Sequence, residues 1–306
     1  MRKDPTVRWR EMMLGLLACA ITLVFSAAAS ARESLRAELI RWQEEEGLTL
    51  AWVDNNAQST SLMTHSTVRG GVRAVSFKTR SVVPLKNSLQ AFQPDGFSFE
   101  EFPEFAGIGM CWSHDQTKLV SIMFDHSTRS GRLGILDLKS KQTRAVPIVV
   151  DKEPMVTSQC WSQNDKEFVY ETDGTVRLYD IETERADDVA KGTDPSWSPD
   201  GEWIGFRDGD AYYATHPDGS KRKKLFRNHW GSAVSALYWS PNSKIVAYVR
   251  ELGFLQGGAL DAEVNQLRAR RLEDGSDVSL CPDSVDWYAN YHWITSSEFV
   301  KHPGTE

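Results

Sequence analysis

The sequence has 306 residues, of which 41% are hydrophobic, and a formal net charge of −7 at pH 7. A chain of this length can bury one sizeable hydrophobic core. An acidic chain gains no counterion release from phosphate groups, so its charge argues against a nucleic-acid partner. The one basic run, Lys221–Lys224, follows the turn sequence Pro217-Asp218-Gly219, and we interpret it as a solvated hairpin flank.

Residues 1–31 have the pattern of a secretory signal peptide. Basic residues are followed by an apolar core, Met12–Phe25, and then by the small residues Ala29-Ser30-Ala31. We therefore expect cleavage after Ala31 and a periplasmic or secreted protein with no later membrane span. An uncleaved membrane anchor is one alternative, because Met12–Ala29 is near the short limit of ~17–25 residues for a span. A lipid-modified Cys19 is another.

A short helix is expected next, at residues 32–47, before the main domain. Leu35, Leu39 and Trp42 recur at helical spacing, and Gly47 is a suitable stop. We expect this helix to pack on the main domain. The alternative is that its narrow apolar stripe docks to a partner.

Trp-Ser pairs then divide the chain into repeats, whose tryptophans are Trp112, Trp161, Trp197 and Trp239. Their spacings of 49, 36 and 42 residues are typical of β-propeller blades. Each pair opens a short polar turn, and Ser198-Pro199-Asp200-Gly201 has the residue preferences of a tight turn at every position.

A strand follows each turn in the same register. The seventh residues after the tryptophans are Leu119, Phe168, Ile204 and Val246, and the ninth are Ser121, Tyr170, Phe206 and Tyr248. Positions two apart share one face of a strand, so these residues are predicted to form a common buried face. A hairpin of alternating residues comes next in each repeat. Four antiparallel strands per repeat are typical of propeller blades, which makes the expected fold all-β.

The two ends of the chain decide the number of blades. Trp293 begins another repeat that stops after its second strand, and Leu48–Leu85 contains a plausible outer hairpin. If the N-terminal strands complete the blade begun at Trp293, the ring has five blades and no exposed edge. If Leu48–Leu85 is a blade of its own, the ring has six, and six is the number that we expect. The propeller is predicted to occupy residues 48–306.

Removal of the first 31 residues would leave three cysteines, Cys111, Cys160 and Cys281. An odd number leaves at least one of them free or paired between chains. Cys111 and Cys160 each precede a Trp-Ser pair, and we interpret both as small buried apolar residues.

The segment Asp194–Phe206 (Asp-Pro-Ser-Trp-Ser-Pro-Asp-Gly-Glu-Trp-Ile-Gly-Phe) resembles the repeat of TolB-type propellers, and Trp239–Tyr248 is similar to it. The resemblance covers roughly Cys111–Leu280. It implies a propeller of six or seven blades, commonly periplasmic or extracellular and often used to bind proteins. TolB itself has an α/β domain before its propeller, for which Arg32–Gly47 is too short, so its role in the Tol–Pal system is not carried over. The repeat identifies architecture better than function.

Common catalytic and metal-binding motifs are missing from the sequence. It has no Gly-x-Ser-x-Gly, His-Glu-x-x-His, phosphate-loop or Cys-x-x-Cys motif, so we assign no catalytic residue, metal or cofactor. Asp208-Gly209-Asp210 could supply oxygen ligands to calcium, but we interpret it as a hairpin turn.

The segment Trp287–Trp293 contains five aromatic rings in seven residues. We predict that Trp287, Tyr288, Tyr291 and His292 contact a partner, because aromatic side chains supply large contact areas at interfaces. Packing between blades is the alternative for these residues, and it is the preferred interpretation for Trp293.

Taken as a whole, the sequence favours an exported interaction module that binds an envelope or extracellular protein through loops at one end of the ring. A peptide or a glycan is the alternative ligand. A second hypothesis is a hydrolase or lyase acting on a glycan or peptide, which needs Asp, Glu or His side chains that converge in the channel. A third is a ligand sensor held at the membrane by an uncleaved N-terminus.

Overall fold

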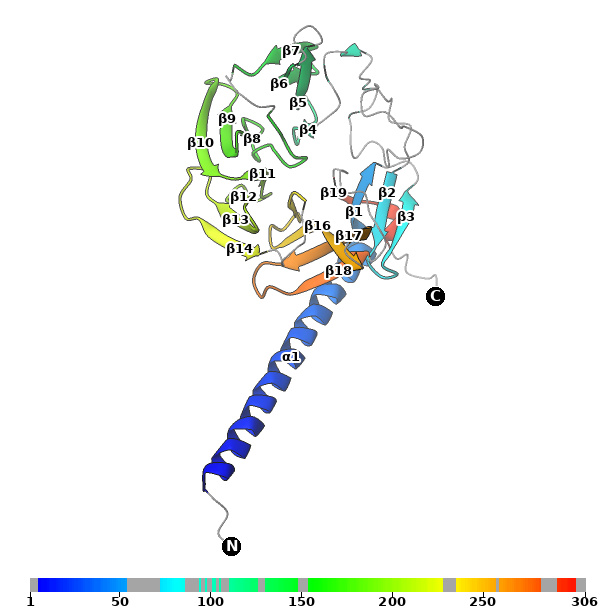
Figure 1. Ribbon diagram of the computed structural model, residues 1–306. Coiled ribbons are helices and arrows are strands. Elements are labelled where there is room, and N and C mark those ends of the chain that lie inside the picture. Colours follow the sequence, from blue (N-terminus) through cyan, green and yellow to red (C-terminus); the bar gives the residue numbers. More distant parts are fainter. Residues whose placement is uncertain are drawn as a thin grey trace.

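The computed structural model describes residues 5–53, 72–85, 94, 97, 101–102, 105, 110–125, 130–147, 154–227, 235–256, 259–281 and 291–300. Within these ranges a long helix, α1 (Pro5–Glu46), is followed by five antiparallel sheets around a common axis (Figure 1). The fold is an all-β propeller of five blades.

Blade 1 joins the two ends of the chain and consists of β19 (His292–Thr295), β1 (Leu48–Val53), β2 (Val72–Ser76) and β3 (Ser81–Leu85). Blade 2 consists of β4 (Cys111–Trp112), β5 (Lys118–Asp125), β6 (Ser130–Asp137) and β7 (Gln142–Ala145). Blade 3 consists of β8 (Glu167–Thr172), β9 (Thr175–Asp180) and β10 (Arg185–Lys191). Blade 4 consists of β11 (Thr193–Trp197), β12 (Ile204–Asp208), β13 (Ala211–Thr215) and β14 (Lys223–Arg227). Blade 5 consists of β15 (Tyr238–Trp239), β16 (Ile245–Gln256), β17 (Ala259–Arg271) and β18 (Asp277–Cys281).

Blade 3 has three strands in the described residues, and a single bridge between Trp161 and Phe168 marks the position of its innermost strand. A short 3-10 helix, η3 (Ser297–Phe299), follows β19.

The pairing of β1 with β19 sets the number of blades at five rather than the six that we preferred. Leu48 lies opposite Thr295 and Leu50 opposite Trp293, so Leu48–Leu85 is not a separate blade. The strands β1 to β3 instead complete the sheet that Trp293 begins, which is the arrangement behind the five-blade alternative. This pairing occupies the edge of β19 and of β1, which would otherwise expose free backbone hydrogen-bonding groups.

The repeated strand register is confirmed in blades 2 to 5. The seventh residues after the repeat tryptophans are Leu119, Phe168, Ile204 and Val246, and all of them are fully buried. The ninth residues, Ser121, Tyr170, Phe206 and Tyr248, are buried too. The intervening residues are also covered, because the opposite face of each strand packs on the next blade. The sequence pattern therefore places each second strand between two neighbouring blades.

The serine of each Trp-Ser pair fastens the turn that follows it. Ser113 Oγ accepts a hydrogen bond from the backbone N–H of Lys118 at 2.9 Å and donates one to Asp115 Oδ1 at 2.7 Å. The same pair of bonds is formed by Ser162, Ser198 and Ser240, with Asn164, Asp200 and Asn242 as the acceptors. Burial alone would raise the pKa of Asp115, but hydrogen bonds from Ser113 and Thr117 outweigh it and lower that pKa to about 2.

Helix α1 is longer than the expected short helix at residues 32–47. It runs without a break through Ala31, because the residues from Met12 onward are rich in Ala and Leu and contain no proline. It ends where predicted, at Gly47, which has φ +71° and whose added Cβ would lie 2.3 Å from the carbonyl oxygen of Ser296. Both facts require glycine at this position.

The C-terminal part of α1 packs on the propeller, as expected. Leu35 and Leu39 are fully buried in a core cluster with side chains of blades 1 and 5. The Gln43 amide is inserted at β2, where it donates to Val75 O at 2.8 Å and accepts from Phe77 N at 2.9 Å. Glu38 pairs with Arg271 of β17 at 2.5 Å. These contacts fix the direction of the helix relative to the ring.

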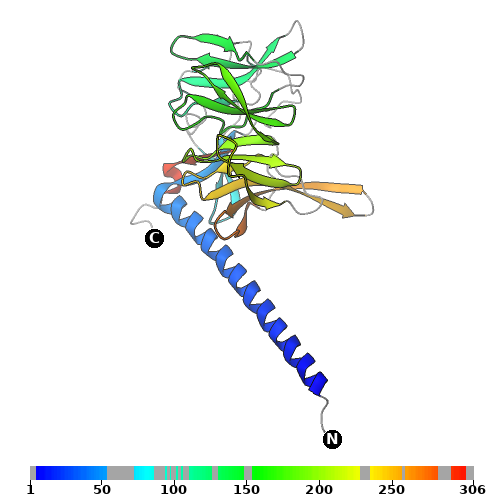
Figure 2. The same ribbon diagram turned by 90° about the vertical axis from the view of Figure 1, so that its left-hand side faces the viewer.

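The N-terminal part of α1 projects away from the ring in both views (Figures 1 and 2). Figure 2 also shows the long hairpin of β16 and β17 extending beyond the other strands of the molecule. In the part of the chain that the structure describes, no helix is both long enough and apolar enough to cross a membrane.

Candidate functional site

A pocket of about 430 Å³ lies at the end of the axis where the Trp-Ser turns meet, and we call it the axial pocket. It receives one tryptophan from each blade: Trp112, Trp161, Trp197, Trp239 and Trp293. Its other lining residues include Ser158, Gln159, His114, Gln116, Pro199, Pro241 and His292. Because the lining comes from all five blades, the pocket is centred on the axis of the ring.

The tryptophans hold neighbouring blades together. The indole N–H of Trp161 donates to Cys111 O at 2.9 Å, and that of Trp239 donates to Ser196 Oγ at 3.0 Å. The indole of Trp293 donates to Tyr238 O at 3.1 Å, so the preferred interpretation of Trp293 as a packing residue is confirmed. Trp112 and Trp293 remain partly exposed in the pocket, whereas the other three rings are buried.

Polar side chains cross the axis and form the floor of the axial pocket. Gln159 donates through Nε2 to Trp239 O at 2.9 Å and accepts from Trp239 N at 2.6 Å. Ser158 Oγ donates to Tyr291 O at 3.2 Å. These bonds connect blade 3 with blades 5 and 1. None of them involves the rim residues His114 and Gln116.

Two histidines lie at different depths in this pocket. His292 begins β19, and burial lowers its pKa to about 4, so its imidazole is neutral at pH 7. His114 lies at the rim, where its side chain is 55% exposed and its Nδ1 is 2.8 Å from Asp165 Oδ1 of the next blade. The described lining contains no carboxylate. Its polar groups therefore suit hydrogen bonding to a ligand at neutral pH.

The predicted partner-contacting residues lie in different environments. Trp287 and Tyr288 lie outside the described residues. Tyr291 is fully buried, with its ring 5.0 Å from that of Trp52 and 5.4 Å from that of Tyr238, so we leave it out of the candidate surface. His292 lines the axial pocket. Inspection of the sequence missed Gln116, Ser158 and Gln159, although the first belongs to a recognised turn and the others precede a repeat tryptophan.

Cys111 and Cys160 form a disulfide with Cα atoms 6.0 Å apart. Both are buried, as expected, but our interpretation of them as unbonded apolar residues is wrong. They occupy the same position, directly before the tryptophan, in blades 2 and 3. Equivalent positions of adjacent blades face each other near the axis, and this is the signal that could have predicted the bond. Cys281 is buried and is not part of this disulfide.

The interpretation of Asp208-Gly209-Asp210 as a hairpin turn is confirmed, since it connects β12 with β13. Asp208 pairs with Arg222 and Asp210 with Arg227, each at 2.6 Å. Across the described residues, no three His, Cys, Asp or Glu side chains are placed to hold a metal ion.

The chain is similar to several solved structures at low sequence identity. No family model and no curated protein matches the sequence. Among solved structures, the chain is similar to a protein from Agrobacterium tumefaciens assigned as TolB, with 13% identity, 81% of this chain and 99% of that chain covered, and a TM-score of 0.49. It is also similar to TolB from Acinetobacter baumannii, with 13% identity and a TM-score of 0.46. That comparison covers 76% of this chain and 54% of the other, so the chain spans about half the length of the Acinetobacter protein.

An oligogalacturonate lyase in complex with manganese gives 14% identity and a TM-score of 0.42, with 69% of this chain and 58% of that chain covered. At such scores we draw nothing about function from these likenesses. The class that the fold itself defines is a five-bladed β-propeller.

The lowered pKa of His292 makes the free energy of unfolding depend on pH. The imidazole titrates near pH 6.5 in the unfolded chain and at about 4 in the folded protein. Between these values the unfolded state binds the additional proton, so the free energy of unfolding is expected to fall as the pH is lowered from 6.5 to 4. Urea unfolding of the wild type and of His292→Asn across this range should give a shallower slope for the variant, and equal slopes would contradict the expectation.

Proposed function

We propose that this chain is an exported propeller that binds an envelope or extracellular protein at the axial pocket. The observation that carries the proposal is the convergence of all five blades on one pocket, with Trp112, Trp293 and His114 partly exposed in it. Aromatic surface and neutral hydrogen-bonding groups on a rigid scaffold are the features of a site that receives a peptide segment.

The chemistry of the lining supports a peptide segment as the part of the partner that enters. The indole rings offer apolar contact area, and the Gln116 side chain at the rim offers a donor and an acceptor to a peptide backbone. A volume of about 430 Å³ matches one or two side chains of a partner better than a folded domain. The surrounding turns would then contact the rest of the partner.

Export is supported by two independent features. Residues 1–31 have the order of a signal peptide, and a disulfide joins blades 2 and 3. Disulfides persist in oxidising compartments such as the bacterial periplasm and the extracellular space. Sequencing the N-terminus of the protein purified from cell envelopes tests the predicted cleavage, and a chain that begins at Arg32 is the expected result.

The partner site is tested by photo-crosslinking in cells. A photo-reactive phenylalanine analogue is placed at Gln116 or Pro241, which are exposed rim residues from two different blades, and captured proteins are identified by mass spectrometry. Both positions are expected to capture the same exported protein. The purified partner should then bind the wild type in solution, and Gln116→Ala together with His114→Ala should weaken binding about tenfold or more, which corresponds to about 1.4 kcal/mol.

Arg185 provides the matched control, because it is an exposed residue on β10, away from the axial pocket. The same analogue at this position should capture the partner much less. Equal capture from Arg185 and Gln116, or no capture from either rim position of the folded protein, would contradict binding at the axial pocket.

A further inference from the structure

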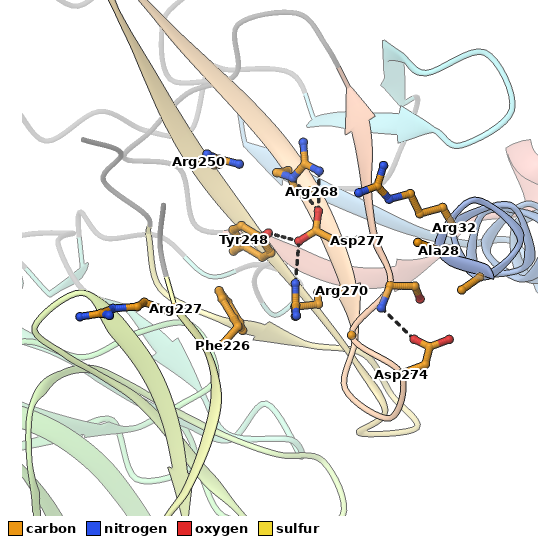
Figure 3. Close-up of a pocket in the computed structure, with 13 residues that line it drawn as sticks. Ala28, Arg32, Phe226, Arg227, Tyr248, Arg250, Arg268, Arg270, Asp274 and Asp277 are labelled. Atoms are coloured by element: carbon orange, nitrogen blue, oxygen red, sulfur yellow. Dashed lines mark hydrogen bonds and ion pairs between the residues drawn. The ribbon is translucent and has the colours of Figure 1, made fainter. Parts of the chain in front are cut away.

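A second pocket, of about 290 Å³, lies between α1, blade 4 and blade 5, and we call it the arginine pocket. Figure 3 shows side chains of α1, β14, β16, β17 and β18 around it. Its lining includes five arginines, Arg32, Arg227, Arg250, Arg268 and Arg270, and two carboxylates, Asp274 and Asp277. A surplus of positive charge in one pocket is unexpected for a chain with a net charge of −7.

The alternation of strand residues explains how the arginines come together. Val249, Leu267 and Ala269 of β16 and β17 point into the core, so their neighbours point to the opposite face. On this face, Arg250 lies opposite Gln266, and Arg268 lies opposite Tyr248. Figure 3 shows Arg32 reaching from α1 toward the strands that carry Arg250 and Arg268.

The ion pairs that the described residues form within and around the pocket leave part of this charge without a counterion. Arg227 pairs with Asp210 at 2.6 Å, and Asp274 pairs with Arg271 at 3.0 Å; both partners lie outside the lining. Asp277 is shared by Arg268 at 2.5 Å and Arg270 at 3.5 Å, and it also accepts a hydrogen bond from Tyr248. The Asp277 carboxylate is therefore the counterion of both Arg268 and Arg270.

Arg250 and Arg32 are the remaining two arginines of the lining. The Nε of Arg250 is buried and has no hydrogen-bond partner in the described residues, and no described carboxylate forms an ion pair with either arginine. A buried donor without a partner is destabilising, especially on a charged group. An anion in the pocket would supply the missing acceptor.

We propose that the arginine pocket binds a phosphate group. Guanidinium groups form paired, charge-assisted hydrogen bonds with the oxygens of a phosphate, and several arginines around one cavity are suited to an anion with more than one negative charge. The cavity is larger than a phosphate ion, so it also holds part of the group to which the phosphate is attached.

Two kinds of ligand carry a phosphate group of this chemistry. One is the headgroup of an anionic lipid, because Ala28, Ala31 and Arg32 line the pocket and follow directly on the apolar segment Met12–Phe25. The other is a soluble phosphate ester. Cleavage after Ala31 would favour the second source, since it removes part of the wall next to the helix and places a new α-amino group at Arg32.

Binding experiments with the protein as purified from cells, its N-terminus established by sequencing, test the proposal and separate the sources. Calorimetric titration uses inorganic phosphate and glycerol 3-phosphate, and sedimentation uses phosphatidylcholine vesicles with and without phosphatidylglycerol. Each is repeated with Arg250→Gln, Arg32→Gln and the control Arg185→Gln, which removes the same charge at an exposed surface position. Thermal unfolding shows that each variant is folded, and the exposed Arg32 provides the test if Arg250→Gln does not fold.

Binding of the soluble phosphates that is weakened at least tenfold in Arg250→Gln and Arg32→Gln, but unchanged in Arg185→Gln, supports the pocket and a soluble ester. The same dependence seen only with phosphatidylglycerol vesicles supports the pocket and a lipid headgroup. The proposal is overturned if no probe binds, or if Arg185→Gln weakens binding as much as the pocket variants do.

Discussion

Replacing Trp239 with alanine is expected to destabilise the folded protein by about 3–5 kcal/mol, the cost of deleting a large buried aromatic side chain. The side chain is 1% exposed, and its indole N–H donates to Ser196 Oγ of the neighbouring blade. The ring lies so close to Gly205 that an added Cβ there would be 3.0 Å from it. The variant therefore loses both the packing and the hydrogen bond between blades 4 and 5. Urea unfolding followed by circular dichroism measures the change.

Trp203 provides the matched control for this variant. It is only partly buried, with its ring in contact with the Lys223 ammonium at 3.6 Å. Trp203→Ala is expected to cost about 1–2 kcal/mol, within the usual range for single substitutions. If both alanine variants lost the same stability, the tryptophans of the repeat would have no special role in joining blades.

Loss of the Cys111–Cys160 disulfide is expected to lower the free energy of unfolding by about 2–4 kcal/mol. The bond closes a loop with a sequence separation of 49 residues, so it restricts the unfolded chain strongly. The measurement is urea unfolding of the wild type with and without dithiothreitol. The reduced protein should unfold at a lower urea concentration, because its unfolded state gains conformational freedom.

The double variant Cys111→Ser/Cys160→Ser identifies the source of this effect. It should resemble the reduced wild type and should not respond to dithiothreitol, although it retains the buried Cys281 thiol. A wild type whose unfolding is insensitive to the reductant would contradict a stabilising role of the disulfide.

The repeat could be predicted from sequence because its physical causes are local. The Trp-Ser pair, the polar turn and the buried residue seven positions later depend only on strand alternation and turn preferences, and all of them are confirmed. The aspartate or asparagine at the third position after each tryptophan belongs to the same pattern. Its hydrogen bond from the serine was not predicted, although the residue types themselves indicate it.

Most residues of the candidate sites could not be predicted from the sequence. The axial pocket combines side chains from five repeats, and the arginine pocket combines residues as distant as Arg32 and Arg270. Residues of the aromatic segment Trp287–Trp293 were predicted to contact a partner because their rings are close together in the sequence. The structure places its residue Tyr291 in the core, where it fills space between blades 1 and 5.

By itself, then, the sequence determined the blade architecture, the strand register and the end of α1 at Gly47, since each depends on residues close together in the chain. Only the tertiary structure decided the closure of the ring with five blades, the pairing of Cys111 with Cys160 and the gathering of arginines beside α1. These features arise from contacts between residues separated by 49 to more than 200 positions. Local preferences carry no information about which of many distant partners gives the best-packed and best-paired arrangement.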